Sequence, residues 1–211
     1  MRYLVTGGAG FIGSHLVEAL LGAGHEALVV DDFSTGRHEN IAHLEASDQV
    51  KVICASVTDS DLMRDCIASV DGVFHLAAAV GVRLIIDEPV KTIETNVEGT
   101  ASVLGACARF RKPVLITSTS EVYGMSEKVP FSEDDYSVIG PPTFRRWSYA
   151  SSKALDEFLA LAHWHQSGLP VVIARLFNTV GPRQTGRYGM VSPRFVRQAL
   201  SDKPITVFGD G

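Results

Sequence analysis

The sequence is poor in cysteine, in long apolar runs and in excess positive charge. Its 211 residues include 3 cysteines, an odd number, so we expect reduced thiols in the core and no disulfide framework. Lys and Arg number 19 against 24 Asp and Glu, and a nucleic-acid partner is not expected because such partners select a basic surface. The apolar runs are too short or too interrupted to span a bilayer, so no membrane association is expected.

Signs of export and of a histidine metal site are also missing. Residues 1–6 pass directly into a glycine turn, without the apolar segment and cleavage site of a signal peptide, so we expect a cytoplasmic location. His163 and His165 are two positions apart on a predicted helix and point to different faces, so no metal site is expected. The length suits one domain, or one domain and a fragment of another.

Short β-type runs alternate with longer stretches of helical periodicity. Strands are predicted at 3–6, 26–31, 50–55, 73–76, 114–117 and 171–176, with a weaker one at 205–208. Helices are predicted at 11–21, 61–67, 90–110, 149–166 and 193–200. Because parallel strands need crossover helices, this rhythm predicts a doubly wound α/β fold with a parallel sheet. The polar segment 126–147 is predicted to be a long loop over a functional site.

A glycine-rich turn lies between the first predicted strand and the first predicted helix. Gly7, Gly10 and Gly13 recur at regular intervals, and Gly8 completes a Gly-x-Gly-x-x-Gly pattern. One glycine permits a tight turn, another lets the backbone approach a pyrophosphate, and Gly13 lets the helix pack closely on the strand. The helix N-terminus then faces the phosphate charge. The turn therefore predicts a Rossmann-like, dinucleotide-binding site.

Asp31 ends the second predicted strand, where the dinucleotide motif requires an acidic residue. A carboxylate there accepts hydrogen bonds from both hydroxyls of the adenosine ribose and repels a 2′-phosphate, which predicts NAD and not NADP as the cofactor. Arg37 is the alternative, as a partner for such a phosphate, although it lies further along the chain. A strand cap without any cofactor contact is the structural alternative for Asp31.

Tyr149 and Lys153 lie at positions i and i+4 of a predicted helix, so their side chains share one face. An unperturbed phenol has a pKa of about 10 and is a poor base at neutral pH. An ammonium group beside it favours the ionised form, and the pair is therefore typical of a redox enzyme in which Tyr149 acts as a base. A surface pair without chemistry is the alternative, which the glycine motif disfavours.

Five segments in this order resemble the extended short-chain dehydrogenase/reductase family, whose members modify nucleotide sugars. They are residues 7–15, 31–37, 75–78, 149–153 and 175–183. The resemblance implies a tightly held NAD that takes hydride from sugar C4 and later returns it, with Tyr149 as base and Lys153 bonded to the nicotinamide ribose. It also implies that Asn178 holds the nucleotide-sugar diphosphate, and that helices 90–110 and 149–166 form a homodimer.

The resemblance further implies which positions contact NAD besides Tyr149 and Lys153. These are Gly7, Gly10, Phe11, Ile12, Gly13, Asp31, Asp32, Phe33, Ser34, Thr35, Gly36, Ser56, Val57, Leu76, Ala77 and Ala78. Family members often carry an Asp that contacts adenine after the third strand. This chain has Ser56 there, for which we expect a weaker version of that contact.

Thr119, Ser120 and Glu121 follow the fifth predicted strand, at the edge where α/β sites lie. The triplet resembles that of UDP-glucuronate decarboxylases. This implies C4 oxidation followed by loss of the C5 carboxylate, with Thr119 and Ser120 holding the sugar and Glu121 managing protons near C5. A UDP-hexose or UDP-uronate 4-epimerase and a nucleotide-sugar 4,6-dehydratase are the alternatives, because residues 150–152 are more typical of those classes.

A non-catalytic NAD-binding protein is a more remote alternative, which the presence of Tyr149, Lys153 and Glu121 disfavours. The resemblance implies an NAD-binding domain at residues 1–175 and the start of a substrate-binding lobe at 176–211. Family members continue past the position of Gly211, so we expect the C-terminal substrate lobe to be largely missing from this chain.

Overall fold

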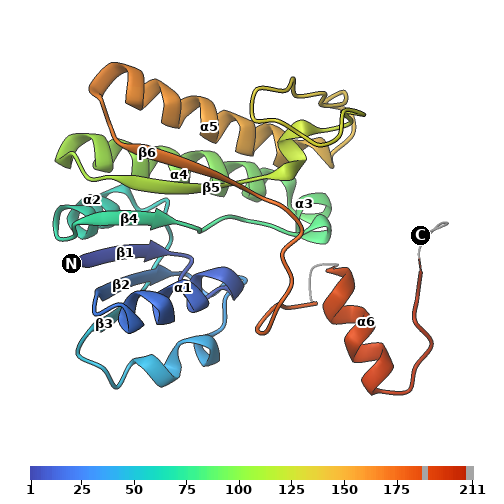
Figure 1. Cartoon of the computed structure of the whole chain (residues 1–211), viewed down its shortest axis with the longest axis horizontal. Coiled ribbons are helices and arrows are strands. Elements are labelled where there is room, and N and C mark those ends of the chain that lie inside the picture. Colours follow the sequence, from blue (N-terminus) through green and yellow to red (C-terminus); the bar gives the residue numbers. More distant parts are fainter. Residues whose placement is uncertain (187–189, 208–211) are drawn as a thin grey trace.

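The computed structural model describes residues 1–186 and 190–207, which form a parallel sheet flanked by helices (Figure 1). The strands are β1 (Arg2–Thr6), β2 (Glu26–Asp31), β3 (Val50–Cys54), β4 (Gly72–His75), β5 (Val114–Thr119) and β6 (Val171–Leu176). Their order is β3-β2-β1-β4-β5-β6, and each neighbouring pair is parallel. This order is that of the doubly wound dinucleotide-binding fold, so the predicted fold class is confirmed.

Helical segments lie between the strands, as parallel pairing requires. The α-helices are α1 (Phe11–Gly22), α2 (Ser60–Ala68), α3 (Val82–Asp87), α4 (Pro89–Phe110), α5 (Trp147–Ser167) and α6 (Val191–Leu200). Short 3-10 helices lie at η1 (His38–Asn40), η2 (Ala42–Leu44) and η3 (Ser120–Tyr123). Among the described helices, none has the length and apolar character that a membrane crossing needs.

The two faces of the sheet carry separate apolar cores. Successive strand residues point to opposite faces, so Leu4 and Val5 of β1 belong to different clusters. The Leu4 cluster includes residues of α2, α4 and α5, such as Ile67 and Leu104, whereas the Val5 cluster includes Val17 of α1. Helices thus cover both faces, and the carboxyl ends of the strands remain as the edge from which loops leave.

Two sequence expectations about local structure are wrong, and one short helix was not predicted. Residues 205–207 form no strand, since Ile205 and Val207 are exposed and have no neighbouring strand to pair with; residue 208 lies outside the described residues. The short helix α3 was not predicted, because it has only 6 residues and ends at Asp87, two positions before Pro89. Cys54 is exposed at the end of β3 and is not in the core, unlike the other two cysteines.

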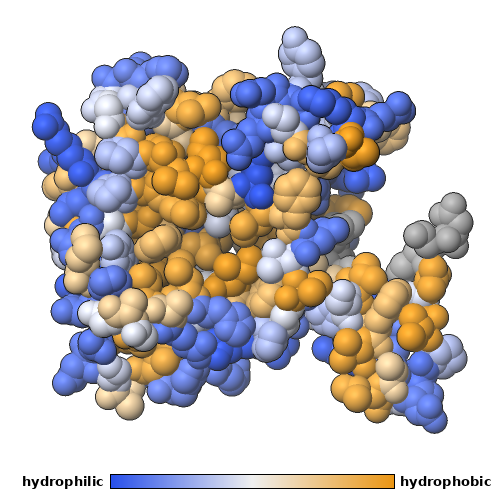
Figure 2. All heavy atoms as spheres, viewed as in Figure 1, coloured by the Kyte–Doolittle hydropathy of each residue, from blue (hydrophilic) through white to orange (hydrophobic). Residues whose placement is uncertain are grey.

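Helix α6 stands apart from the sheet at the lower right of Figure 1, and none of its residues is buried. Its apolar side chains include Val191, Val196 and Leu200, which are 59%, 58% and 85% exposed. Figure 2 shows apolar surface gathered over this helix, at the lower right. An amphipathic helix normally buries its apolar stripe, so α6 has an apolar face that the described residues leave uncovered.

Candidate active site

The predicted site residues lie on loops that leave the carboxyl edge of the sheet. The strand order reverses at β1 and β4, since β2 and β3 lie on one side and β5 and β6 on the other. Ligands of open α/β sheets bind outside the carboxyl ends of the strands at such a point. The candidate site is therefore built by the glycine turn after β1 and by the loops after β2, β4 and β5.

The turn after β1 is too tightly packed for side chains at its first and last glycines. Gly7 has a φ of +70°, and a Cβ atom built on it would lie 2.8 Å from the nitrogen of Ala77. A Cβ atom on Gly13 would lie 2.1 Å from the carbonyl oxygen of Gly7. A side chain at either position would therefore force the backbone apart.

Helix α1 begins directly after this turn and presents an uncapped N-terminus. Gly10 is its N-cap and offers no side-chain oxygen to the first helical N–H groups, and the first turn holds no acidic residue. Helix N-termini carry partial positive charge and free N–H donors, both of which favour a phosphate. Phe11, Ile12 and Gly13 supply these N–H groups, so the turn is suited to the pyrophosphate of a dinucleotide.

Asp31 is 7% exposed, and it ties the glycine turn to β2. Its Oδ2 atom accepts a hydrogen bond from the Ala9 N–H group at 2.9 Å, and its Oδ1 atom accepts one from the Phe33 N–H group at 2.9 Å. A Cβ atom on Gly36 would lie 2.9 Å from Oδ1, so only glycine closes over the carboxylate. Each carboxylate oxygen has a second lone pair, so Asp31 has a structural role and keeps the capacity to bind ribose hydroxyls.

The loop after β2 is ordered by its own hydrogen bonds. Asp32 Oδ1 accepts from the Ser34 N–H group at 2.9 Å and from the Ser34 hydroxyl at 2.6 Å. Asn40 donates through Nδ2 to the Ala9 carbonyl oxygen at 2.8 Å and so fastens the far end of the loop to the glycine turn. The predicted cofactor positions 32–36 therefore lie in one folded loop beside Asp31, with Thr35 between Ser34 and Gly36.

The loop after β4 packs directly on the glycine turn. The Ala77 N–H group donates a hydrogen bond to the Thr6 hydroxyl at 3.3 Å. The segment from Leu76 to Ala78 therefore lies beside Gly7. Asn96 of α4 holds the next part of the loop, because its Oδ1 atom accepts from the Ala79 N–H group at 2.8 Å. Three of the predicted cofactor residues are thus fixed at the centre of the site.

The two predicted adenine-side residues differ in what they offer. The Ser56 hydroxyl bonds with the Thr58 hydroxyl at 2.8 Å and accepts from the Thr58 N–H group at 3.2 Å. Val57 is 4% exposed and packs against α4, where a Cβ atom on Gly99 would lie 2.6 Å from its Cγ2 methyl group. The Val57 side chain therefore belongs to the core, and its backbone is what remains for a ligand.

Predicted catalytic side chains come together where β5 runs into η3 and α5 begins. The Thr119 hydroxyl is placed to bond with that of Tyr149, while burial and then the nearby charge of Glu121 raise the Tyr149 pKa. Thr119 also accepts a hydrogen bond from the Glu121 N–H group at 3.2 Å, and Ser120 lies between them in η3. Desolvation raises the pKa of Glu121 and Arg146 opposes this shift, so Glu121 keeps its proton to a higher pH than an ordinary glutamate.

Lys153 is buried beside this cluster, but its partner is not the predicted one. Its Nζ atom donates to Asp156 Oδ2 at 2.7 Å, and within residues 1–186 and 190–207 it makes no hydrogen bond to Tyr149. Burial, then the charge of Glu121, raises the pKa of Tyr149 above its ordinary value. The structure therefore does not show the expected lowering of the Tyr149 pKa by Lys153, because burial raises this pKa and the ammonium group is bound to Asp156.

Comparison with known proteins identifies the family of this chain. Residues 3–211 match the NAD dependent epimerase/dehydratase family. The chain belongs to this family. It is 45% identical to the UDP-N-acetyl-alpha-D-glucosaminuronate decarboxylase of Bacillus cytotoxicus, over 100% of this chain and 64% of that protein. It is 42% identical to UDP-glucuronic acid decarboxylase 1 of Arabidopsis thaliana, over 100% of this chain and 47% of that protein.

Solved structures resemble this epimerase/dehydratase family member along its whole length. The UDP-glucuronic acid 4-epimerase of Bacillus cereus, in complex with UDP-glucuronic acid and NAD, has a TM-score of 0.89 and 34% identity and covers 100% of this chain and 67% of its own. DesIV, the dTDP-glucose 4,6-dehydratase of Streptomyces venezuelae with NAD bound, has a TM-score of 0.89 and 33% identity, with 100% and 66% covered. The family resemblance of the sequence motifs is thus confirmed.

Asn178 is the predicted site residue that the structure does not join to the others. It follows β6 and is exposed, and no hydrogen bond links it to the Tyr149 cluster in the described part of the chain. Arg175, which lies in β6 just before Asn178, donates hydrogen bonds of 2.9 and 2.7 Å to the Glu157 carboxylate. The substrate role of Asn178 therefore stays a prediction.

Sequence reasoning missed three residues that hold the site of this family member together. Asn40 and Asn96 bond to backbone atoms far away in sequence, so no local spacing could have revealed them. Asp156 is different, because a carboxylate three residues after a lysine on a helix lies on the same face. That spacing was available in the sequence as a signal for the Lys153 ion pair.

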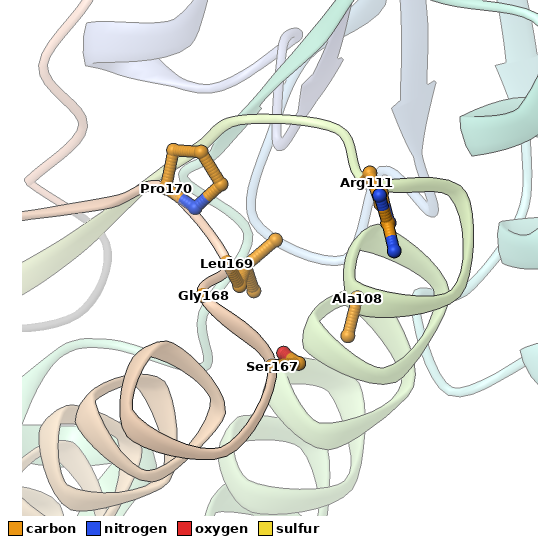
Figure 3. Close-up of a pocket in the computed structure, with 6 residues that line it drawn as sticks. All are labelled: Ala108, Arg111, Ser167, Gly168, Leu169 and Pro170. Carbon is orange, nitrogen blue, oxygen red and sulfur yellow. The ribbon is translucent and has the colours of Figure 1, made fainter.

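A hollow of about 320 Å³ lies at the opposite end of the fold (Figure 3). It is lined by Ala108, Arg111, Ser167, Gly168, Leu169 and Pro170. These residues come from the ends of α4 and α5 and from the segment just before β6, so they lie at the amino edge of the sheet. The hollow therefore does not belong to the candidate active site of this epimerase/dehydratase family member.

Proposed function

We propose that this chain is the cofactor-binding part of a decarboxylase that uses NAD to oxidise C4 of a UDP-sugar bearing a C5 carboxylate. The observation that carries the proposal is the meeting of Tyr149, Thr119 and Glu121 at the carboxyl edge of β5. The identities of 45% and 42% to two UDP-uronate decarboxylases support it. Because the chain spans 64% and 47% of those proteins, the reaction belongs to the intact protein.

NAD is the proposed cofactor because the chain offers a place for each of its charged and polar parts. The N–H groups at the start of α1, with Gly7 and Gly13, would hold the pyrophosphate. Asp31 would accept from the ribose hydroxyls and disfavour a 2′-phosphate. Lys153 would reach the nicotinamide ribose. When bound, NAD supplies the chemistry of taking up and returning a hydride.

In the proposed reaction, Tyr149 removes the proton of the C4 hydroxyl while the hydride leaves C4. The product is a 4-keto sugar whose C5 carboxylate lies β to the ketone, and such an acid loses carbon dioxide readily because the electrons delocalise into the carbonyl as an enolate. Thr119 and Ser120 would orient the C4 hydroxyl and the carboxylate. Glu121 would return the proton to C5, for which its raised pKa suits it.

Replacement of Glu121 by Gln is expected to slow decarboxylation by on the order of 10²- to 10⁴-fold. The amide keeps the size of the side chain but has no exchangeable acidic proton, so NAD affinity should not change. Single-turnover release of carbon dioxide measures the effect. Glu26→Gln is the matched control, since Glu26 lies at the opposite end of the sheet with its side chain 59% exposed. Equal turnover in both variants would contradict a catalytic role for Glu121.

Mass spectrometry of the nucleotide sugar tests the proposed reaction. The intact protein that contains this chain is incubated with NAD and with UDP-glucuronate or UDP-N-acetylglucosaminuronate. Loss of carbon dioxide is the expected result. A 4-epimerase would leave the mass unchanged and alter the proton spectrum, and a 4,6-dehydratase would release water in a parallel incubation with a UDP-hexose. Either of these outcomes would overturn the decarboxylase proposal, and binding of NAD without any turnover would favour a non-catalytic protein.

We also propose that residues 1–175 form the NAD-binding domain and that 176–211 begin a substrate-binding lobe. The sheet, both cores and the Tyr149 cluster lie before residue 177. Helix α6 supports the boundary, because it has an apolar face and no buried residue. Further chain packed against α6 would cover that face, as expected for a lobe that the chain only starts.

A homodimer is the proposed assembly of the intact protein. Helix α5 exposes Leu155, Phe158, Leu161 and Trp164, whose exposed fractions are 49%, 72%, 43% and 51%. Leu155, Phe158 and Leu161 follow each other at helical spacing of three residues, and α4 packs beside α5. A contiguous exposed apolar face of this kind marks an interaction surface. Sedimentation velocity of the intact protein tests the assembly, and a monomer at micromolar concentration would contradict it.

A further inference from the structure

A chain of buried polar side chains connects the glycine turn to Lys153. The Thr6 hydroxyl lies 2.7 Å from Nδ1 of His75, and Nε2 of His75 lies 3.2 Å from the Thr100 hydroxyl. Burial raises the pKa of Asp156, while the Lys153 ammonium, bound at 2.7 Å, and the Thr100 hydroxyl beside the carboxylate oppose this shift. Burial lowers the pKa of His75 to about 3, so its ring is neutral and the net charges are those of Asp156 and Lys153.

Burial of the Asp156 carboxylate costs free energy, so a purely structural role does not account for this residue. It is 1% exposed, and its Oδ1 atom has no full hydrogen-bond partner within the described residues. Buried carboxylates are destabilising unless they are fully paired, and apolar replacements for buried ion pairs are often equally stable. The function of Asp156 is therefore to be sought in the group that it contacts, which is Lys153.

The charges around the Tyr149 hydroxyl indicate how the ion pair of Asp156 and Lys153 affects the ionisation of Tyr149. Glu121 of η3 and Asp156 of α5 both raise the pKa of Tyr149, after the larger effect of burial. The Lys153 ammonium is a positive charge, but the Asp156 carboxylate lies 2.7 Å from it and binds it.

Other charged groups near this cluster have partners of their own or carry no charge. Glu157 is paired with Arg175 at 2.7 Å, and Arg146 acts on Glu121. His75 of β4 is neutral. An ammonium bound to a carboxylate favours a phenolate less than an unpaired one does.

We propose that Asp156 is a positioning residue that binds the Lys153 ammonium and so limits how strongly Lys153 favours the ionised form of Tyr149. The carboxylate and the phenolate compete for one cation, and the Thr6–His75–Thr100 chain fixes the carboxylate in that competition. Tyr149 consequently holds its proton until further positive charge enters the site. This inference rests on the base role of Tyr149 in the proposed function.

The test compares the ionisation of Tyr149 in three backgrounds of the intact protein: wild type, Asp156→Asn and Glu157→Gln. Ultraviolet absorbance of tyrosinate is followed through an alkaline pH titration without NAD, and the same titration with Tyr149→Phe in each background is subtracted. In Asp156→Asn, Tyr149 is expected to ionise at a pH lower by about one unit or more, the size of shift that a nearby charge causes. Glu157→Gln removes the neighbouring carboxylate, which does not bind Lys153, and should leave this pH unchanged.

The same variants separate this inference from the proposed function. In single-turnover oxidation, the acid limb of the pH–rate profile should move to lower pH by about one unit in Asp156→Asn, which is about tenfold in rate below that limb. A wild type that oxidises no UDP-sugar would overturn the proposed function, while the tyrosinate titration would still test Asp156. Identical Tyr149 ionisation in wild type and Asp156→Asn, an equal shift in Glu157→Gln, or a shift in Asp156→Asn that is unchanged when Lys153→Met is added would overturn the inference. Asp156→Ser replaces Asp156→Asn if thermal unfolding shows that the amide does not fold.

Discussion

Replacement of Tyr149 by Phe is expected to lower the rate of C4 oxidation by on the order of 10²- to 10⁴-fold, the contribution of a positioned base. The substitution removes one oxygen and keeps the ring, which is 7% exposed and packed at the start of α5. Formation of NADH in a single turnover, followed by its absorbance, measures the step directly. NAD affinity should change little, because the glycine turn and Asp31 are untouched.

Tyr3→Phe is the matched control for this variant. Tyr3 lies in β1 at the amino edge of the sheet, and its hydroxyl contacts only the Met1 sulfur at 3.2 Å among the described residues. The Tyr3→Phe variant should oxidise the sugar at the wild-type rate. If Tyr149→Phe also keeps the wild-type rate of NADH formation, the base is another group, and Glu121 becomes the first candidate because its charge already acts on Tyr149.

The sequence was sufficient to predict the fold because the fold depends on local patterns. All six strands of the sheet overlap predicted strands, and five of the α-helices overlap predicted helices. Apolar periodicity and the glycine turn carry this information in short windows. The weak strand predicted at 205–208 is absent from its described part, 205–207, for a reason outside its own sequence: a strand needs a neighbour to pair with, and none of the described strands lies beside Ile205 and Val207.

The site was predictable in its positions but not in its electrostatics. Gly7, Gly13 and Asp31 stand where the motif places them, since backbone geometry limits those positions to few residue types. The ionisation of Tyr149 depends instead on burial and on which partner Lys153 selects. Helical spacing allows Lys153 to pair with residues on either side of it, and the choice of Asp156 is made by tertiary packing around α4 and α5.

Replacement of Gly13 by Ala is expected to weaken NAD binding by about 10- to 100-fold and to lower the free energy of unfolding by about 1–3 kcal/mol, the range for an overpacked site. The added methyl group would lie 2.1 Å from the Gly7 carbonyl oxygen and 2.8 Å from the Gly8 Cα atom. Both neighbours are backbone atoms and cannot move aside as a side chain would. Isothermal titration with NAD and thermal unfolding measure the two effects.

Gly22→Ala separates this steric effect from the general effect of a glycine-to-alanine change in the same helix. Gly22 ends α1, and a Cβ atom there would meet nothing within 4 Å. Because alanine restricts the unfolded chain, Gly22→Ala should stabilise the protein by about 0.4–1 kcal/mol and leave NAD affinity unchanged. The opposite signs of the two stability changes are the decisive feature. Stabilisation of the protein by Gly13→Ala, as expected for Gly22→Ala, would contradict the inference that close packing of α1 on the glycine turn shapes the dinucleotide site.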